Sequence, residues 1–552
     1  MLQKTVSNKN MSGWWKNDGM PPDKGIVAVK RSIRDLMRPV FLVDFDGQLA
    51  VTQGGSITIG DTPSVGINGC PLHAYTPPLH PKNLGDPVFK KAHNLRYAYI
   101  IGAMANGITS TQMVEEAGRA GMLGFFGAAG LRLNEIETAI CRLHQRMGSI
   151  PFGFNLIHNL NEPELEAQTV QLYLRHKIRL ISASAFMDLT LPLVYFRVKG
   201  IHRDPEGNII CPNKIIAKVS RVEVAKKFLS PPPEKILGQL VEKKMIALEE
   251  ANLAKYLPMA EDLTAEADSG GHTDNRPALS LLPTMLALRD KLNEKYGYQR
   301  SICIGLGGGI ATPESTAAAF SMGAAFVLSG SINQACLEAG TSDAVRQMLA
   351  ETRQADVTMA PAADMFEMGS KVQVLKRGTL FPFRAAKLYD LYLRYNSYED
   401  IPQKEKTALE RDIFNFSFLN EWKQTKQFFM SKDPKQITRA EKDTHHKMAL
   451  VFRSYLGRSS KWANSGNPER KFDYQIWCGP SMGAFNAWTN GSFLEKPGNR
   501  KVVTLAMNLL FGAAVLTRVN WLRNQNVELP NGVGHVAPTP LSEIYTLLNE
   551  KE

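Results

Sequence analysis

Between residues 96 and 331, short apolar segments alternate with stretches of helical periodicity, and this alternation restricts the fold more than any other feature of the sequence. The apolar segments have the length and the boundaries typical of strands. Eight strands joined mainly by helices over roughly 240 residues match the count and size of a (β/α)8 TIM barrel, an α/β fold. A doubly wound open sheet is the alternative, but eight evenly spaced units favour the barrel. The predicted strands are residues 97–103, 122–126, 152–157, 179–184, 215–219, 263–267, 301–305 and 324–328.

The sequence on either side of this alternating region differs from it in composition and periodicity, which divides the chain into three predicted regions. Residues 1–95 are rich in glycine and proline and are predicted to form a β-containing lead-in. Residues 96–384 are predicted to form the barrel, with a helical insertion near residues 222–261 and room for a hairpin in residues 191–213. Residues 385–552 carry helical patterns rich in aromatic residues, so we predict a helical C-terminal domain.

Composition places the chain among ordinary globular proteins. Of its 552 residues, 44% are hydrophobic and 21% are charged, which excludes a mainly disordered, collagen-like or coiled-coil chain. The longest apolar run, residues 506–516, is too short to span a bilayer, and the N-terminus lacks the apolar core of a signal peptide. The six cysteines are scattered, without a CxxC spacing or a cluster with histidine. We therefore expect reduced thiols in a cytoplasmic protein, with neither disulfides nor a metal site.

The charge of the chain is unevenly distributed. The net charge is +12, which indicates an acidic partner. Residues 423–471 alone carry 12 basic and 4 acidic residues. A solvated helical surface is the simplest interpretation of such a run. Nucleic acid is not an expected partner, because no aromatic-basic RNA motif or DNA-binding helix pattern accompanies the charge.

Two glycine turns follow the last two predicted strands of the barrel. One is Gly305-Leu306-Gly307-Gly308-Gly309-Ile310, and the other is Gly330-Ser331. Glycines there let backbone N–H groups approach a phosphate, and a helix begins after each turn. In TIM barrels the loops after strands seven and eight are the usual phosphate site. A dinucleotide fingerprint would need a glycine where Ile310 stands, so the turns indicate a barrel phosphate site and not a Rossmann fold.

Three polar side chains lie at predicted strand ends. His272 follows the sixth strand in Asp268-Ser269-Gly270-Gly271-His272, a suitable place for an acid, a base or a polarising group. Lys218 lies inside an apolar strand, where an anion must offset its desolvation unless it reaches solvent. Asn155 could bond a ring amide or cap the next turn.

The segment Gly479-Pro480-Ser481-Met482-Gly483 matches the GxSxG nucleophile elbow. Glu495 or Glu528 and His535 lie downstream, so the chain order of a Ser, acid, His triad is available. The elbow needs a preceding parallel sheet, however, and this region has a helical pattern. A buried turn is therefore the favoured interpretation.

Taken together, the segments resemble the PfaD family, the flavin-dependent enoyl reductases of polyunsaturated fatty acid synthases, with relatives in trans-acyltransferase polyketide pathways. The wider superfamily, which includes nitronate monooxygenases and flavin-dependent enoyl-ACP reductases, shares only the barrel motifs. Ser481 departs from the pattern, which has alanine there, and this weakens its interpretation as a nucleophile. The segments that carry the resemblance are GAMANGI (102–108), GFFGAAGL (124–131), FGFNLIHN (152–159), SASAFM (182–187), IIAKVSR (215–221), EADSGGHTDNRP (266–277), LSGSINQACLEAGTSD (328–343), APAADMFEMGSKVQVLKRGTLFP (360–382) and DYQIWCGPSMGAFNAW (473–488).

The resemblance implies FMN as cofactor and NADPH or NADH as hydride donor. Backbone contacts of the loop after the first strand would line the isoalloxazine ring, and Asn155 and Lys218 would bond its pyrimidine edge. The two glycine turns would hold the phosphate, and His272 would stand beside the flavin where the acyl chain enters. On this basis His272 is the predicted catalytic residue, and the predicted cofactor-binding residues are Ala103, Met104, Asn155, Lys218, Gly270, Gly271, Gly308, Gly309, Gly330 and Ser331.

The reaction implied is reduction of a trans-2-enoyl thioester on an acyl carrier protein, during polyunsaturated fatty acid or polyketide synthesis. The expected partners are acyl carrier protein domains of a synthase, which are generally acidic, and the basic residues 423–471 are a candidate docking surface. No membrane partner is expected, and a homodimer is left open. The rival functions are a nitronate monooxygenase, a non-catalytic flavin-bearing scaffold subunit and a thioester hydrolase acting through Ser481.

Overall fold

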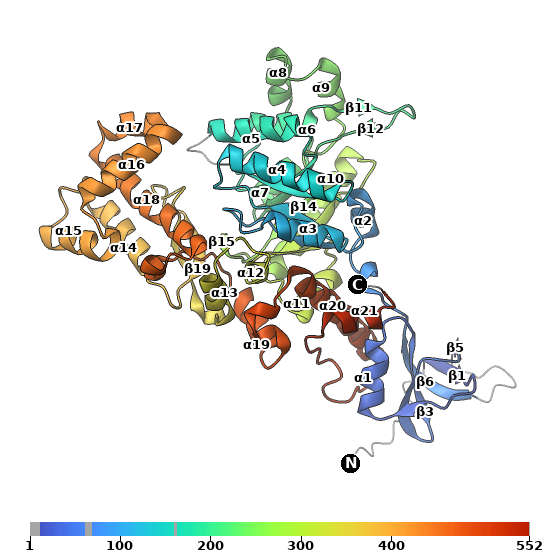
Figure 1. Ribbon diagram of the computed structural model, residues 1–552. Helices are drawn as coiled ribbons and strands as arrows, with labels where there is room; N and C mark the ends of the chain where they lie inside the picture. The colour runs from blue at the N-terminus through green and yellow to red at the C-terminus, as the bar shows by residue number, and fades with distance from the viewer. Residues whose placement is uncertain (1–11, 61–68, 159–162, 551–552) are drawn as a thin grey trace.

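The computed structural model describes residues 12–60, 69–158 and 163–550. Its centre (Figure 1) is a closed barrel of parallel strands. The strands follow one another around the barrel in the order β10-β13-β14-β16-β17-β7-β8-β9. All eight predicted segments overlap strands of this barrel, so the predicted fold is confirmed and the open sheet is excluded. The strands are β7 (Tyr99–Ile101), β8 (Leu123–Phe126), β9 (Gly153–Ile157), β10 (Leu180–Ser184), β13 (Lys214–Val219), β14 (Asp262–Glu266), β16 (Cys303–Gly307) and β17 (Val327–Ser329).

Helices follow the barrel strands, and polar side chains cap the N-termini of several of them. Thr312 accepts a hydrogen bond from the N–H of Ser315, and Pro313 is the first helical residue. Ser110 caps the helix after β7 in the same way, through the N–H of Met113. The helices of this ring are α3 (Thr111–Arg119), α4 (Leu133–Met147), α5 (Pro163–Arg175), α6 (Leu191–Val198), α7 (Val222–Phe228), α10 (Ala278–Tyr296), α11 (Pro313–Ser321) and α12 (Ser331–Gln334).

The two long connections of the barrel contain extra elements. A hairpin of β11 (His202–Arg203) and β12 (Ile209–Ile210) precedes β13, where the sequence leaves room for one. The pair α8 (Glu234–Glu242) and α9 (Leu248–Ala254) lies between the end of α7 and the start of β14. Both insertions therefore lie at the end of the barrel where the strands begin, opposite to the end that TIM barrels use for catalysis.

The N-terminal region is a six-stranded antiparallel sheet in the order β2-β4-β3-β6-β1-β5. The guanidinium of Arg518, in α20 (Val502–Arg523), ties this region to the barrel by donating to the backbone oxygens of Ile33, Asp35 and Arg38. The elements are β1 (Gly13–Lys16), β2 (Asp23–Lys24), α1 (Ile26–Arg34), β3 (Val40–Phe45), β4 (Gln48–Thr52), β5 (Ser56–Ile59), β6 (Gly69–Thr76) and, leading into the barrel, α2 (Pro87–His93).

After the barrel, the chain forms a small antiparallel sheet with a layer of helices, and then a C-terminal segment that packs against the barrel. Strands β18 (Val357–Pro361) and β19 (Lys371–Leu375) join β15 (Gly271–His272) in a three-stranded antiparallel sheet. The helical layer is α14 (Phe381–Arg394), α15 (Gln403–Leu409), α16 (Phe418–Lys432), α17 (Pro434–Ala440) and α18 (Thr444–Ser465), and it stands beside the barrel in Figure 1. It has its own apolar core, built around Phe366, Leu388 and Phe452.

The remaining helices return to the barrel. They are α19 (Ser481–Thr489), α20 (Val502–Arg523) and α21 (Leu541–Leu547), after α13 (Asp343–Ala350) earlier in the chain. Residues of α20 such as Leu505, Leu509 and Val519 belong to the same core cluster as the barrel. Residues 385–550 therefore pack as two parts, the helical layer and a segment that covers the barrel; the domain boundaries given above remain a prediction.

Helix α20 corrects the prediction made from its apolar run. It extends over 22 residues, Val502–Arg523, so it is long and apolar enough to cross a membrane by length and composition, whereas residues 506–516 alone are too short. Of its most apolar 18-residue window, 89% is buried inside the protein. This is the burial of a core helix, which explains why the run is apolar on every side.

Candidate active site

A cavity of about 1030 Å³ lies at the carboxyl ends of the barrel strands, between the barrel and the helical layer. The barrel supplies its floor from strand β9 and from the loops after β7, β8, β10, β13, β14, β16 and β17, and α16 and α18 supply the opposite wall. All eleven residues predicted from the sequence line this one cavity: Ala103, Met104, Asn155, Lys218, Gly270, Gly271, His272, Gly308, Gly309, Gly330 and Ser331. The structure thus brings them together, while their individual roles remain predictions.

The two glycine turns leave open space beside the backbone. A Cβ added at Gly309 or at Gly330 would meet no protein atom within 4 Å. Gly309 has φ +76°, a conformation that other residues rarely adopt. Gly308 is required for a different reason, because its Cβ would lie 2.7 Å from the backbone of Ala267. A phosphate group fits such a cradle, since backbone N–H groups can approach it without side chains between them.

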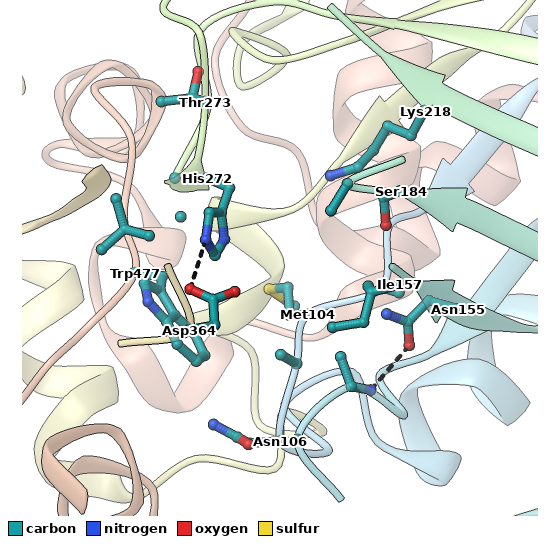
Figure 2. Close-up of a pocket in the computed structure, with 18 of the residues that line it drawn as sticks. Met104, Asn106, Asn155, Ile157, Ser184, Lys218, His272, Thr273, Asp364 and Trp477 are labelled. Atoms are coloured by element: carbon teal, nitrogen blue, oxygen red, sulfur yellow. Dashed lines mark hydrogen bonds and ion pairs between the residues drawn. The ribbon is translucent and has the colours of Figure 1, made fainter. Parts of the chain in front are cut away.

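Asn155 braces the loop after β8. Its Oδ1 accepts hydrogen bonds from the N–H groups of Ala128 at 2.7 Å and Ala129 at 3.2 Å (Figure 2). The oxygen thus holds the turn that precedes Asn155 in the chain and not the next turn, and a bond from Asn155 to a ring amide stays a prediction. The neighbouring loop after β7 is braced in a similar way, because Met104 N–H donates to Thr109 Oγ1 at 2.9 Å.

Lys218 has a carboxylate partner that the sequence interpretation missed. Its Nζ lies 2.6 Å from Oε1 of Glu266, and Ser269 Oγ donates to the same oxygen at 3.2 Å. Lys218 is level with Thr264 on the adjacent strand, and Glu266 lies two residues further on the same face. The anion required to offset the desolvation of Lys218 is therefore supplied from β14. The sequence did contain a signal for this pair, because Glu266 lies near the end of the predicted strand that follows the strand carrying Lys218.

His272 is held in place by the three-stranded sheet of β15, β19 and β18. As part of β15 it is level with Val372 of β19, and its Nε2 lies 3.1 Å from Oδ1 of Asp364 (Figure 2). The side chain is 43% exposed and faces the cavity wall with Asp364. Desolvation lowers the pKa of the ring, but the hydrogen bond and charge of Asp364, with the charge of Glu266, outweigh this. The pKa of His272 is therefore raised above its ordinary value, which favours the protonated ring near neutral pH.

The helical layer contributes directly to the cavity. Gln424 and Phe428 of α16 and Arg453, Arg458 and Lys461 of α18 line it, and Lys461 Nζ lies 5.8 Å from the ring centre of Phe428. Part of the basic region 423–471 therefore borders the cavity.

Ser481 lines the cavity but lacks the surroundings of a nucleophile elbow. It begins α19, and the chain before it makes a single antiparallel bridge, from Trp477 to Val374, instead of a parallel strand. Glu495, Glu528 and His535 lie within the described chain, and none of them lines the cavity. The Ser, acid, His order in the sequence thus does not become a triad.

Comparisons with known proteins match two parts of the chain to families. Residues 88–390 match the family described as nitronate monooxygenase. Residues 395–474 match the inserted helical domain of [acyl-carrier-protein] S-malonyltransferase. The first match covers the barrel and the second covers most of the helical layer.

Among individual proteins, the polyketide biosynthesis protein PksE of Bacillus subtilis is 47% identical over 436 residues, which are 79% of this chain and 56% of that protein. A polyunsaturated fatty acid synthase protein of Thraustochytrium sp. is 43% identical over 80% of this chain and 30% of its own length. The chain thus spans about half or less of these relatives. They confirm the resemblance predicted from the sequence.

A solved structure is similar over nearly its whole length. The enoyl reductase domain of MlnA, from the macrolactin biosynthesis cluster of Bacillus amyloliquefaciens, is 40% identical with a TM-score of 0.75. The match covers 81% of this chain and 99% of that domain.

Proposed function

Because the chain belongs to the nitronate monooxygenase family, we propose that it is a flavin-dependent oxidoreductase that reduces enoyl thioesters carried on an acyl carrier protein. The observation that carries this proposal is the 40% identity to the enoyl reductase domain of MlnA over 99% of that domain, together with a cavity lined by all the predicted site residues. The pathway would be polyketide or polyunsaturated fatty acid synthesis, since the similar PksE and the Thraustochytrium synthase protein carry those names.

The cavity fits FMN. Gly309 and Gly330 offer open backbone for the phosphate, with Ser331 beside them. Lys218, held by Glu266, provides a cation for the pyrimidine edge of the ring. A bound FMN would supply the hydride-transfer chemistry between NADPH or NADH and the β-carbon of the enoyl thioester.

The protein must manage the charge and the proton that accompany this hydride. Addition at the β-carbon moves the electron pair of the double bond towards the thioester oxygen, and the α-carbon then takes a proton. We assign the proton to His272, because its ring lines the cavity and its raised pKa favours the protonated form. Product formation then leaves a neutral imidazole that recovers its proton from solvent.

A spectrum and one substrate test the proposal. The purified protein should show the absorbance bands of bound flavin, NADPH should bleach them, and a crotonyl thioester should restore them without oxygen. A protein that retains flavin but is not bleached by NADPH would instead be the scaffold subunit.

The second candidate function is a nitronate monooxygenase, favoured by the family matched over residues 88–390. It would use the same barrel and flavin to oxidise small nitronates with O2. Stopped-flow reoxidation of the reduced protein by O2 and by a crotonyl thioester separates the two candidates. Faster reoxidation by O2 with a nitronate substrate, and none by the thioester, would replace the reductase proposal.

The proposed macromolecular partner is the carrier protein, and the helical layer is its proposed docking surface. Residues 395–474 match a helical domain from an enzyme named for the acyl carrier protein, and the same layer forms one wall of the cavity. Lys435 and Arg439 have side chains 87% and 66% exposed, and Lys442 is also exposed. A positive surface there would steer an acidic partner and raise the association rate.

Reversing this charge should affect only the carrier-bound substrate. In the triple variant Lys435→Glu, Arg439→Glu, Lys442→Glu, we expect kcat/KM for a carrier-bound enoyl group to fall about tenfold at low salt and to lose its salt dependence. Crotonyl-pantetheine should be reduced at the normal rate, because it needs no docking.

A matched control reverses three lysines at the far end of the barrel. Lys235, Lys243 and Lys244 in and after α8 are exposed and lie where the strands begin. Their reversal to glutamate should leave both substrates unaffected. Equal effects of the two triple variants on the carrier-bound substrate would mean that net charge, and not a docking surface, is responsible.

A further inference from the structure

The loop between β18 and β19 reaches back to the barrel and places Asp364 at His272. The two residues are 92 positions apart in the sequence, and their side chains lie 3.1 Å apart. The strand carrying His272 pairs with β19, and Gln373 of β19 donates its side-chain amide to Asp268 Oδ1 and to the backbone oxygen of Ser269. The histidine loop and the aspartate loop are thus parts of one sheet, which fixes the distance between them.

The helical layer holds the aspartate loop in place. Arg453 of α18 has a side chain only 9% exposed. Its Nε donates to the backbone oxygen of Ala363 at 2.9 Å, and its Nη1 donates to Glu367 Oε1 at 3.1 Å. One buried guanidinium therefore binds the loop on both sides of Asp364 (Figure 2 shows Asp364 facing His272).

We propose that Asp364 is the positioning residue of His272 and that Arg453 acts through Asp364, so that the helical layer completes the active site of the barrel. This inference rests on the proposed function, in which His272 supplies the proton. The carboxylate accepts a hydrogen bond from Nε2, which fixes the orientation of the ring and stabilises its charged form. Nδ1 is then the nitrogen that exchanges a proton with the substrate.

Other charged groups near the ring act in both directions. Glu266 of β14 favours the protonated ring and Lys218 of β13 opposes it, as does desolvation. Lys371, which precedes Val372 on β19, lines the same cavity. With Asp364 present the pKa of His272 is raised. Glu266 forms an ion pair of 2.6 Å with Lys218. Asp364 is therefore the carboxylate that binds the ring of His272 directly.

The decisive measurement is the pKa of His272 in Asp364→Asn. The ring pKa is measured by NMR in holoenzyme labelled with 15N-histidine, and His272→Gln assigns the signal. The ring pKa should fall in Asp364→Asn. In Asp364→Glu it should return towards its value in the native protein. The pH above which enoyl reduction declines should move in the same direction, because a ring with a lower pKa loses its proton at lower pH. Flavin content should not change.

Arg453→Gln tests the contribution of the helical layer. It should shift the ring pKa in the same direction as Asp364→Asn but by less, since Asp364 itself remains. The controls are Asp390→Asn and Arg394→Gln, which remove an exposed ion pair on α14 of the same layer and should leave the pKa of His272 unchanged.

An unchanged ring pKa in Asp364→Asn would overturn the inference, as would a loss of turnover that is equal at every pH. If Asp364→Asn does not fold, Asp364→Ser decides, because it also removes the charge beside Nε2 and should likewise lower the pKa of the His272 ring; an unchanged pKa in that variant would overturn the inference. The ring pKa needs no substrate. A shifted pKa in an enzyme that does not reduce enoyl thioesters would therefore contradict the proposed function and leave the pairing of Asp364 with His272 standing.

Discussion

Replacing His272 by alanine is expected to slow reduction of a crotonyl thioester by about 10²–10⁴-fold, the usual contribution of a general acid. The flavin should remain bound and NADPH should still reduce it, because the glycine turns that cradle the phosphate lie in other loops of the cavity. The step that is lost is proton delivery to the α-carbon. Single-turnover reoxidation of the reduced flavin by the thioester measures this step apart from reduction by NADPH.

The pH dependence of the same step gives a second test of His272. Its folded-state pKa is raised by Asp364 and Glu266 against desolvation, so the ring is protonated below that pKa and loses its proton as the pH rises through it. Enoyl reduction by the native protein should decline over that range, and the stability contributed by the charged pair with Asp364 should be lost over the same range. In His272→Ala this decline should be absent from the remaining activity.

A histidine outside the cavity is the control. His202 in β11 is exposed, and its Nδ1 contacts only the nearby backbone oxygen of Gly200 among the bonds that the described residues show. His202→Ala should therefore behave as the native protein in both measurements. Normal turnover by His272→Ala would remove His272 from the mechanism.

The barrel could be predicted because its signal is local. Each strand is a buried apolar run, and each glycine turn lies at the strand end where a TIM barrel needs it. Parallel strands in a closed barrel end on the same side, so assigning residues to strand ends also assigned them to one cavity. This is why Asn155, Lys218 and the residues of the two glycine turns were found together without knowledge of any distance.

Asp364 could not be found in this way. It lies in a loop after the barrel, and its approach to His272 depends on β15 pairing with β19, a two-residue strand joined to a strand about a hundred residues later. Such a pairing has no periodic signal in the sequence. The position of α18 above the cavity is equally non-local, because Arg453 reaches the loop through tertiary packing. The apolar run within α20 is shorter than the helix for a related reason: Thr504 and Arg518 are polar residues buried on either side of the run, and they interrupt the apolar pattern without ending the helix.

Replacing Gly330 by leucine is expected to remove most of the flavin during purification. A side chain there would enter the open space that we assign to the phosphate, where no protein atom lies within 4 Å of an added Cβ. Loss of two hydrogen bonds to a charged phosphate costs about 3–6 kcal/mol, which weakens binding by roughly 10²–10⁴-fold. The ratio of flavin absorbance to protein absorbance measures the result. Gly309→Leu should also lose flavin, but its φ of +76° adds backbone strain, so Gly330→Leu is the clearer test.

The matched control is Gly238→Leu, in α8 at the opposite end of the barrel. Gly238 is exposed, and an added Cβ there also meets nothing within 4 Å, so the same substitution adds the same side chain without entering the cavity. This variant should keep its flavin. Because neither Gly330 nor Gly238 has a positive φ, both variants should unfold near the temperature of the native protein once flavin has been removed from all three. Full flavin content in both Gly330→Leu and Gly309→Leu would show that the phosphate is held elsewhere, since a leucine side chain and a phosphate cannot occupy the same space.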